Sequence, residues 1–239
     1  MRPYIVASTS EAGDRTLELS LYGVLDGDLL DESSVSTAEL VAQIRASAAR
    51  EISVRINSVG GSLFGGIALY NALVEHRGDV TCTVEGLAAS AASLVAMAGR
   101  TVMGKGAMMM IHNPQGATVG DANAHRKTAD VLDQARESIV PIYTSKTGKS
   151  NAAIKALLDA ETWMTADEAK SQRFADAVEG SDKPVVSMRG ELVVVAGVAF
   201  PRARVPRQLV TPPTPAELEE AKAIAGVAAA AIAYRARGI

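Results

Sequence analysis

Two apolar, strand-like runs in the first half of the chain each lead through small residues into a helix-like segment. The first run spans 51–56 and continues through Gly60 and Gly61, and the second spans 79–85. Strands that alternate with helices favour a mostly parallel β-sheet with flanking helices, which is an α/β fold. The predicted strands are 17–24, 51–56, 79–85, 100–103 and 107–111, and the predicted helices are 38–48, 63–76, 90–98, 121–143, 150–158 and 166–175.

The glycines after the first run indicate a turn that exposes backbone N–H groups. Glycine adopts positive φ without steric cost, and N–H groups at the start of a helix attract an anion. The spacing of Gly60, Gly61, Gly65 and Gly66 does not fit the dinucleotide fingerprint, and no acidic ribose partner follows at the usual distance. The Gly-Lys-Ser/Thr of a P-loop is absent. We therefore expect a turn that binds an oxyanion.

Ser90 lies in the small-residue segment 86–93, and His112 follows 112 − 90 = 22 positions later. A serine hydroxyl becomes nucleophilic when a neighbouring base takes its proton, so a serine and a histidine on adjoining elements suit acyl transfer. Small neighbours also let a peptide carbonyl approach the hydroxyl. The same pattern fits the close packing of a buried helix, so from the spacing alone both interpretations remain open.

Composition narrows the classes of function. The net charge of −3 gives no electrostatic reason to expect nucleic acid or an anionic membrane as a partner. A single cysteine, Cys82, favours a reducing compartment, and neither a secretory signal nor a membrane-spanning stretch is expected. His76 and His125 lack the spacing of metal ligands, and we predict neither a metal nor a cofactor.

Six blocks of the chain, in order, resemble the ClpP-like serine peptidases, and the resemblance is greatest to the phage-encoded branch associated with capsid maturation. It covers residues 17–178 and implies a ClpP/crotonase-like fold with a protruding handle helix at 121–143. One departure is Val59, where the family usually has proline. The blocks are LYG at 21–23, RINSVGG at 55–61, GGIALYNAL at 65–73, GLAASAAS at 86–93, MMIHNP at 109–114 and ETWMTADEA at 161–169.

The resemblance implies roles for individual residues. Ser90 matches the nucleophile, and His112 matches the general base that later protonates the leaving amine. The backbone N–H groups of Gly61 and Ala91 match the oxyanion hole, where the loss of one donor costs about 10²–10³ in turnover.

The acid of the triad is expected near Trp163. The family usually places an aspartate two residues before this aromatic, and here that position holds Glu161, with Asp159 two residues earlier. Either carboxylate can hold an imidazole in the required tautomer. We predict Glu161 and keep Asp159 as the alternative.

The resemblance further implies a serine endopeptidase that assembles into a ring-shaped homo-oligomer and cleaves scaffold or capsid protein in the host cytoplasm or the procapsid. Because the N-terminal arm does not match the gating loops that meet an unfoldase, we expect ATP-independent action. Two rival functions remain: a crotonase-like acyl-CoA enzyme, which needs an acidic base near the second turn, and a catalytically silent, capsid-associated scaffold subunit.

The chain is expected to divide into a peptidase domain, 1–182, and a C-terminal extension, 183–239. The extension begins with a strand-like run at 193–200. A linker follows at 201–215, which holds five of the nine prolines. Thr214 and Pro215 have the features of a helix start, and an alanine-rich helix is predicted over 217–237.

Overall fold

The computed structural model describes residues 16–27 and 34–179 with their side chains, and the backbone of the strands β1 (Ser8–Thr9), β10 (Val186–Arg189), β11 (Leu192–Val195) and β12 (Val198–Pro201). The chain forms two compact units, Met1–Lys183 and Pro184–Ile239. The first unit contains the residues to which the sequence assigns chemistry.

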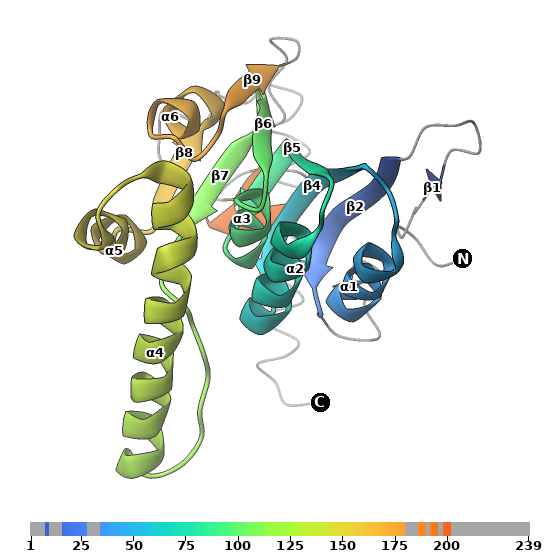
Figure 1. Ribbon diagram of the computed structural model, residues 1–239. Coiled ribbons are helices and arrows are strands. Elements are labelled where there is room, and N and C mark those ends of the chain that lie inside the picture. Colours follow the sequence, from blue (N-terminus) through green and yellow to red (C-terminus); the bar gives the residue numbers. More distant parts are fainter. Residues whose placement is uncertain are drawn as a thin grey trace, which may run out of the picture. The chain divides into compact units, whose positions relative to one another are not determined.

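The first unit is built on a mostly parallel sheet, which confirms the predicted α/β class (Figure 1). Its short strands are β1, antiparallel to β2, and β3 (Ser34–Val35), parallel to β2. β7 (Met108–Ile111) pairs parallel with the end of β5 and antiparallel with β8 (Thr162–Thr165). The main parallel strands, in spatial order, are β2 (Thr16–Leu25), β4 (Glu51–Gly61), β5 (Asp79–Ala89), β6 (Arg100–Gly104) and β9 (Ala177–Glu179).

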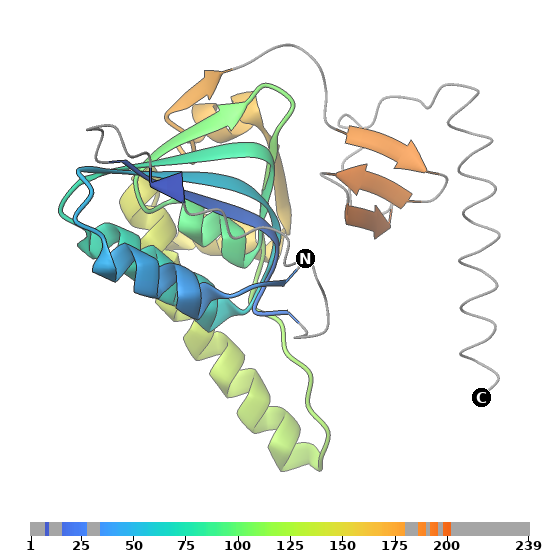
Figure 2. The ribbon, with the colours of Figure 1, turned by 90° about the vertical axis from the view of Figure 1, so that its right-hand side faces the viewer.

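Helices α1 (Thr37–Ala46), α2 (Leu63–Glu75) and α3 (Ala91–Ala96) pack on one face of this sheet (Figure 2). Alternate residues of a strand point to the same face of the sheet, so each strand presents a row of apolar side chains to these helices. In β4, for example, Ile52 and Val54 are buried while Arg55 is exposed. All six residues of α3 are buried, and four of them are alanine or serine, which lets this helix lie close to the sheet.

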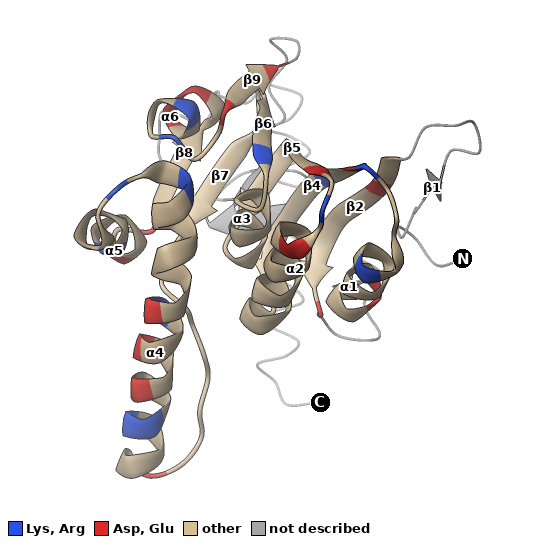
Figure 3. Cartoon of the chain, viewed as in Figure 1, with Lys and Arg blue, Asp and Glu red and all other residues tan. Residues whose placement is uncertain are grey.

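Helix α4 (Ala122–Thr147) is the long helix that the sequence predicts, and its N-terminal half projects from the sheet (Figure 1). Asp121 caps its start, and Gly148, in the left-handed conformation, ends it. Charged side chains lie along the projecting half (Figure 3), whereas the C-terminal half is buried at Ile139 and Tyr143. α4 is therefore anchored at one end beside α3. Helices α5 (Asn151–Asp159) and α6 (Ala166–Ser171) follow it.

Several element boundaries differ from the expectation. β4 and β5 run past the predicted ends, and Gly60 and Gly61 pair with Val24 and Leu25 instead of forming a free turn. The helix predicted over 166–175 stops at Ser171. β8 and β9 were not expected, because strands of four and three residues carry little periodicity of their own.

The strand-like run at 193–200 is not one strand. β11 and β12 form an antiparallel hairpin in which Val195 pairs with Val198, and β10 completes a three-stranded sheet. The predicted linker beyond Pro201 and the predicted helix over 217–237 lie outside the described residues. Within residues 16–27 and 34–179, no helix is long and apolar enough to cross a bilayer.

Cys82 is expected to resist alkylation in the native protein. Its side chain is fully buried in β5, and burial raises the pKa of the thiol to about 12, although the charge of Lys146 opposes this. The reactive thiolate is therefore almost absent at neutral pH. Iodoacetamide followed by mass spectrometry should show no adduct on the folded chain and one adduct after denaturation. Rapid labelling of the folded chain would contradict the buried position.

Candidate active site

Ser90 lies at the sharp turn between β5 and α3. Its backbone has φ +53° and ψ −128°, a combination that a non-glycine residue seldom adopts and that costs on the order of 1–3 kcal/mol. Ser90 occupies the N-cap position of α3, where a serine side chain commonly binds the helix N–H groups, yet it makes no such hydrogen bond. The turn instead presents the hydroxyl away from the helix.

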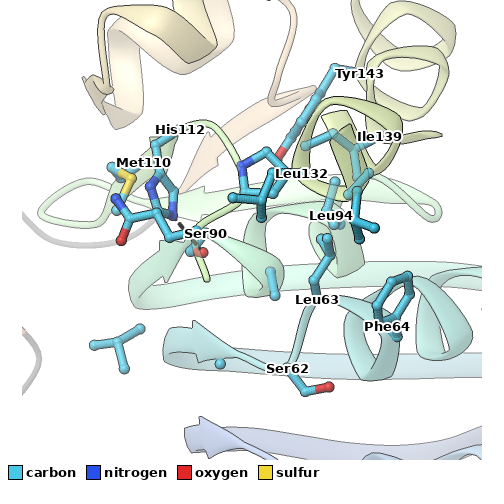
Figure 4. Close-up of a pocket in the computed structure, with 17 residues that line it drawn as sticks. Ser62, Leu63, Phe64, Ser90, Leu94, Met110, His112, Leu132, Ile139 and Tyr143 are labelled. Atoms are coloured by element: carbon cyan, nitrogen blue, oxygen red, sulfur yellow. Dashed lines mark hydrogen bonds between the residues drawn. The ribbon is translucent and has the colours of Figure 1, made fainter. Parts of the chain in front are cut away.

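The hydroxyl of Ser90 faces His112, which directly follows β7. The distance from Ser90 Oγ to His112 Nε2 is 2.8 Å (Figure 4). β5 and β7 are neighbours, and the N–H of Ser90 donates to the carbonyl of Met110 at 2.9 Å. The pairing of these two strands therefore brings together a serine and a histidine that are 22 residues apart in sequence.

Gly60 and Gly61 lie against the serine turn and against β2, respectively. A Cβ at Gly60, where φ is +93°, would lie 2.8 Å from Ser90 Cβ and 2.9 Å from the Ala91 nitrogen. A Cβ at Gly61, where φ is +138°, would lie 2.2 Å from the carbonyl oxygen of Leu25. No side chain fits at either position.

The N–H group of Ala91 lies at the start of α3. The first N–H groups of a helix have no carbonyl partner within that helix. Ala91 and Gly61 both line the cavity that contains Ser90 and His112. Both backbone positions to which the sequence assigns an oxyanion hole are thus at the same cavity as the hydroxyl.

The two candidate acids make different contacts. Asp159 is exposed, accepts a hydrogen bond from Asn113 Nδ2 at 2.8 Å and pairs with Arg136 at 2.9 Å. The hydrogen bond from Asn113, together with the charge of Arg136, holds the pKa of Asp159 below its ordinary value. Glu161 is half-buried, and its Oε1 accepts from Trp163 Nε1 at 3.4 Å.

His112 and Glu161 lie at the end of the β7–β8 ladder. Ile111 pairs with Thr162 in this antiparallel ladder, and His112 and Glu161 are the residues adjacent to that last pair. Glu161 also has a positive φ of 46°, which marks a sharp turn at the entry to β8.

A cavity of about 540 Å³ opens beside the Ser90 hydroxyl. Its apolar wall comes from α2, α3 and α4 (Figure 4). Phe64 is 68% exposed and Val131 is 54% exposed at this wall, and solvent-exposed apolar side chains gathered in a hollow are typical of a binding site. The apolar side chains that line it include Leu63, Phe64, Leu94, Val131, Leu132, Ile139 and Tyr143.

Helix α4 contributes to this cavity, which was not predicted from the sequence. Four of its residues, Val131, Ala135, Ile139 and Tyr143, line the wall and recur every four positions. Residues at this spacing share one face of a helix. The periodicity was readable in the sequence, but only the packing of α4 beside α3 shows that this face meets the serine.

The remaining polar candidates have structural contacts. Ser58 is buried, donates to the carbonyl of Gly23 at 2.6 Å and accepts from the N–H of Gly60 at 3.1 Å. His76 Nε2 lies 3.0 Å from the carbonyl oxygen of Ala49, and His125 lies in the first turn of α4. Within the part of the chain that the structure describes, no group of three His, Cys, Asp or Glu side chains is placed to hold a metal ion.

A serine hydroxyl that bonds to an imidazole at the end of a parallel strand, with helix N–H groups beside it, is the arrangement found in serine hydrolases. A sequence model of the Clp protease family matches residues 25–182. The chain therefore belongs to the Clp protease family and is a serine-type endopeptidase.

Individual relatives agree with this membership. The proteolytic subunit of an ATP-dependent Clp protease from Bacteroides fragilis is 31% identical over 159 residues, which covers 64% of this chain and 76% of the relative. The proteolytic subunit 1 of an ATP-dependent Clp protease from Chlamydia abortus is 31% identical over 183 residues, which covers 69% of this chain and 95% of the relative.

Proposed function

We propose that this peptidase cleaves proteins with Ser90 as the nucleophile and His112 as the general base. The observation that carries the proposal is the 2.8 Å distance between Ser90 Oγ and His112 Nε2. For the hydroxyl to donate to Nε2, the imidazole must carry its proton on Nδ1. A carboxylate near Nδ1 favours that tautomer.

The reaction follows from these positions. His112 Nε2 accepts the proton of Ser90 as Oγ attacks the scissile carbonyl carbon, and the N–H groups of Gly61 and Ala91 stabilise the oxyanion of the tetrahedral intermediate. His112 then gives the proton to the departing amine, which leaves an acyl group on Ser90. Water attacks that ester with His112 again as base, and collapse of the second intermediate releases the acid and restores the hydroxyl.

We assign the third position of the triad to Glu161. Two observations support this choice: Glu161 and His112 are the residues adjacent to the last pair of the β7–β8 ladder, and Asp159 is engaged by Arg136 and Asn113. Glutamate is one methylene longer than the usual aspartate. Glu161 has a positive φ of 46°, so the backbone that carries the longer side chain turns sharply at this residue.

Replacing each acid with its isosteric amide should show which of the two is the third member of the triad. Glu161→Gln is expected to lower kcat by roughly 10³–10⁴-fold, because an amide no longer stabilises the imidazolium that forms during attack. Asp159→Asn should lower kcat by less than about tenfold, since it acts only through neighbouring contacts. Steady-state hydrolysis of a fluorogenic peptide measures both. The opposite order of effects would make Asp159 the acid.

A covalent probe of reactive serines tests the proposal as a whole. A fluorophosphonate should label each subunit of the assembled protein once, and peptide mapping should place the adduct on Ser90. The cavity beside Ser90 predicts cleavage after apolar side chains, because its wall is mostly aliphatic and aromatic. Absence of an adduct from Ser90 in protein that cleaves casein would overturn the assignment.

We further propose that the chain works as a ring-shaped homo-oligomer that matures a phage capsid, with scaffold or capsid protein as substrate, in the host cytoplasm or the procapsid. The six sequence blocks that resemble the phage-type branch support this, as does the C-terminal extension. Co-expression with capsid and scaffold proteins from the same genome, followed by mass spectrometry, should show cleavage that Ser90→Ala abolishes. Intact substrates in both cases would contradict this role.

ATP-independent action belongs to the same proposal, and it differs from the relatives, whose names describe ATP-dependent proteases. It is supported by the N-terminal arm, which does not match the gating loops of the family. Casein hydrolysis should proceed at the same rate with and without a bacterial Clp unfoldase and ATP. A marked stimulation by the unfoldase and ATP together would contradict it.

A further inference from the structure

A buried chain of hydrogen bonds joins the serine turn to helix α4. Ser93 Oγ lies 2.6 Å from the carbonyl oxygen of Ser90 and 2.7 Å from the hydroxyl of Tyr143. Ser93 is 0% exposed and Tyr143 is 1% exposed. Neither hydroxyl takes part in the proposed chemistry, although Tyr143 lines the wall of the cavity beside Ser90 (Figure 4).

The direction of each hydrogen bond follows from the available protons. The carbonyl of Ser90 can only accept a hydrogen bond, so the hydroxyl of Ser93 must donate its single proton to that carbonyl. The hydroxyl of Tyr143 is then the donor to Ser93 Oγ. Burial raises the pKa of Tyr143 well above its ordinary value, so the phenol keeps this proton at any pH at which the enzyme works.

These contacts act on the strained residue itself. The carbonyl of Ser90 accepts from the N–H of Ser93 at 2.9 Å as well as from its hydroxyl. Two donors on one carbonyl oppose rotation of ψ, and ψ at Ser90 is part of the unusual backbone conformation that aims Oγ at His112. A strained conformation persists only where the surrounding structure holds it.

Tyr143 is itself held firmly. Its ring makes an edge-to-face contact with Phe174, with centroids 6.0 Å apart and planes at 60°. Its carbonyl accepts a hydrogen bond from Thr147 Oγ at 2.7 Å. The hydroxyl of Tyr143 is thus held in one position, and it connects the buried C-terminal half of α4 to the serine turn.

We propose that Ser93 and Tyr143 are positioning residues that hold the strained turn of Ser90, so that its hydroxyl faces His112. This inference rests on the proposed role of Ser90 as nucleophile. It assigns to α4, in addition to lining the cavity, a direct mechanical link to the nucleophile. Neither residue touches the substrate bond that breaks.

Two conservative variants test the link. Tyr143→Phe keeps the ring and removes the hydroxyl, and Ser93→Ala removes the relay. Each is expected to lower kcat by about 10- to 100-fold, with a smaller change in KM, since the hydroxyl of Ser90 is misplaced while the binding wall remains. The double variant should be no slower than the slower single variant, because both substitutions break the same chain. Fluorophosphonate labelling of Ser90 should slow in parallel.

Thr101→Val is the matched control. It removes another fully buried hydroxyl, one that donates to the carbonyl of Ala96 at the C-terminal end of α3 at 2.6 Å and contacts neither Ser90 nor Tyr143. We expect a loss of thermal stability similar to that of Tyr143→Phe, with kcat unchanged within about twofold. Wild-type kcat in both test variants, or an equal fall of kcat in the control, would overturn the inference. If Ser90→Ala itself retained activity, the proposed function would fail instead.

Discussion

Replacing Ser90 with alanine is expected to abolish peptide-bond hydrolysis and leave the fold unchanged. The substitution removes Ser90 Oγ, the only protein atom that the proposed mechanism bonds covalently to the substrate. The loss of a catalytic serine lowers kcat by roughly 10⁴–10⁶-fold. The residual rate would come from the oxyanion donors and from substrate binding. Alanine fits the site sterically, because Cβ is retained and the hydroxyl makes no cap bond to α3.

The measurement is casein or fluorogenic peptide hydrolysis by the purified variant, with circular dichroism and particle mass to check the fold and the assembly. Ser36→Ala is a suitable control, since Ser36 caps α1 and its side chain accepts from Glu39 at 3.3 Å. That variant should lose about 1 kcal/mol of stability and keep its activity. Equal hydrolysis by the wild type and Ser90→Ala would defeat the assignment of the nucleophile.

Replacing Gly60 with alanine is the substitution with the second largest expected effect. The added methyl group would stand 2.7 Å from the carbonyl oxygen of Ala89 and 2.8 Å from Ser90 Cβ, which is closer than real Cβ contacts come. The φ of +93° at Gly60 adds strain for any residue that has a side chain. Backbone on both sides of the nucleophile would have to shift, and the N–H of Ala91 would shift with it.

We therefore expect Gly60→Ala to lower kcat by at least about 10²-fold, as the loss of one oxyanion donor does, and to destabilise the fold by more than about 1 kcal/mol. Gly104→Ala is the matched control, because its nearest neighbour to an added Cβ lies at 3.5 Å, an ordinary contact. Chemical denaturation and peptide hydrolysis of both variants measure the two effects. Wild-type activity in Gly60→Ala would show that the turn does not constrain the nucleophile.

Much of the first unit could be predicted because its elements carry local signals. The apolar alternation of β2 and the caps and glycines around α2 and α4 depend only on near neighbours in sequence. The segment around Ser90 was recognisable for the same reason, as a serine among residues too small to block it. The ends of β4 and β5 were predicted too short, because the partners that extend them, in β2 and β7, are distant in sequence.

The sequence near Glu161 and Asp159 is not sufficient to predict which of them is the acid of the triad. Both acids precede Trp163 by a few residues, and nothing in their neighbourhood tells which one acts with His112. The β7–β8 ladder, whose paired residues are 51 to 57 positions apart in sequence, brings the segment that holds both acids beside the one that holds His112. The ion pair that draws Asp159 to α4 likewise depends on how α4 packs against α5.

By itself, the sequence determined the α/β class, the serine and histidine, and the glycines that give them room, because residue size, periodicity and backbone freedom are local properties. The tertiary structure alone decided that Ser90 meets His112 at hydrogen-bonding distance, that α4 lines the cavity, and that Tyr143 reaches the serine turn through Ser93. The two hydrogen bonds join residues 22 and 50 positions apart. They exist only once strand register and helix packing are in place, and no local pattern encodes either.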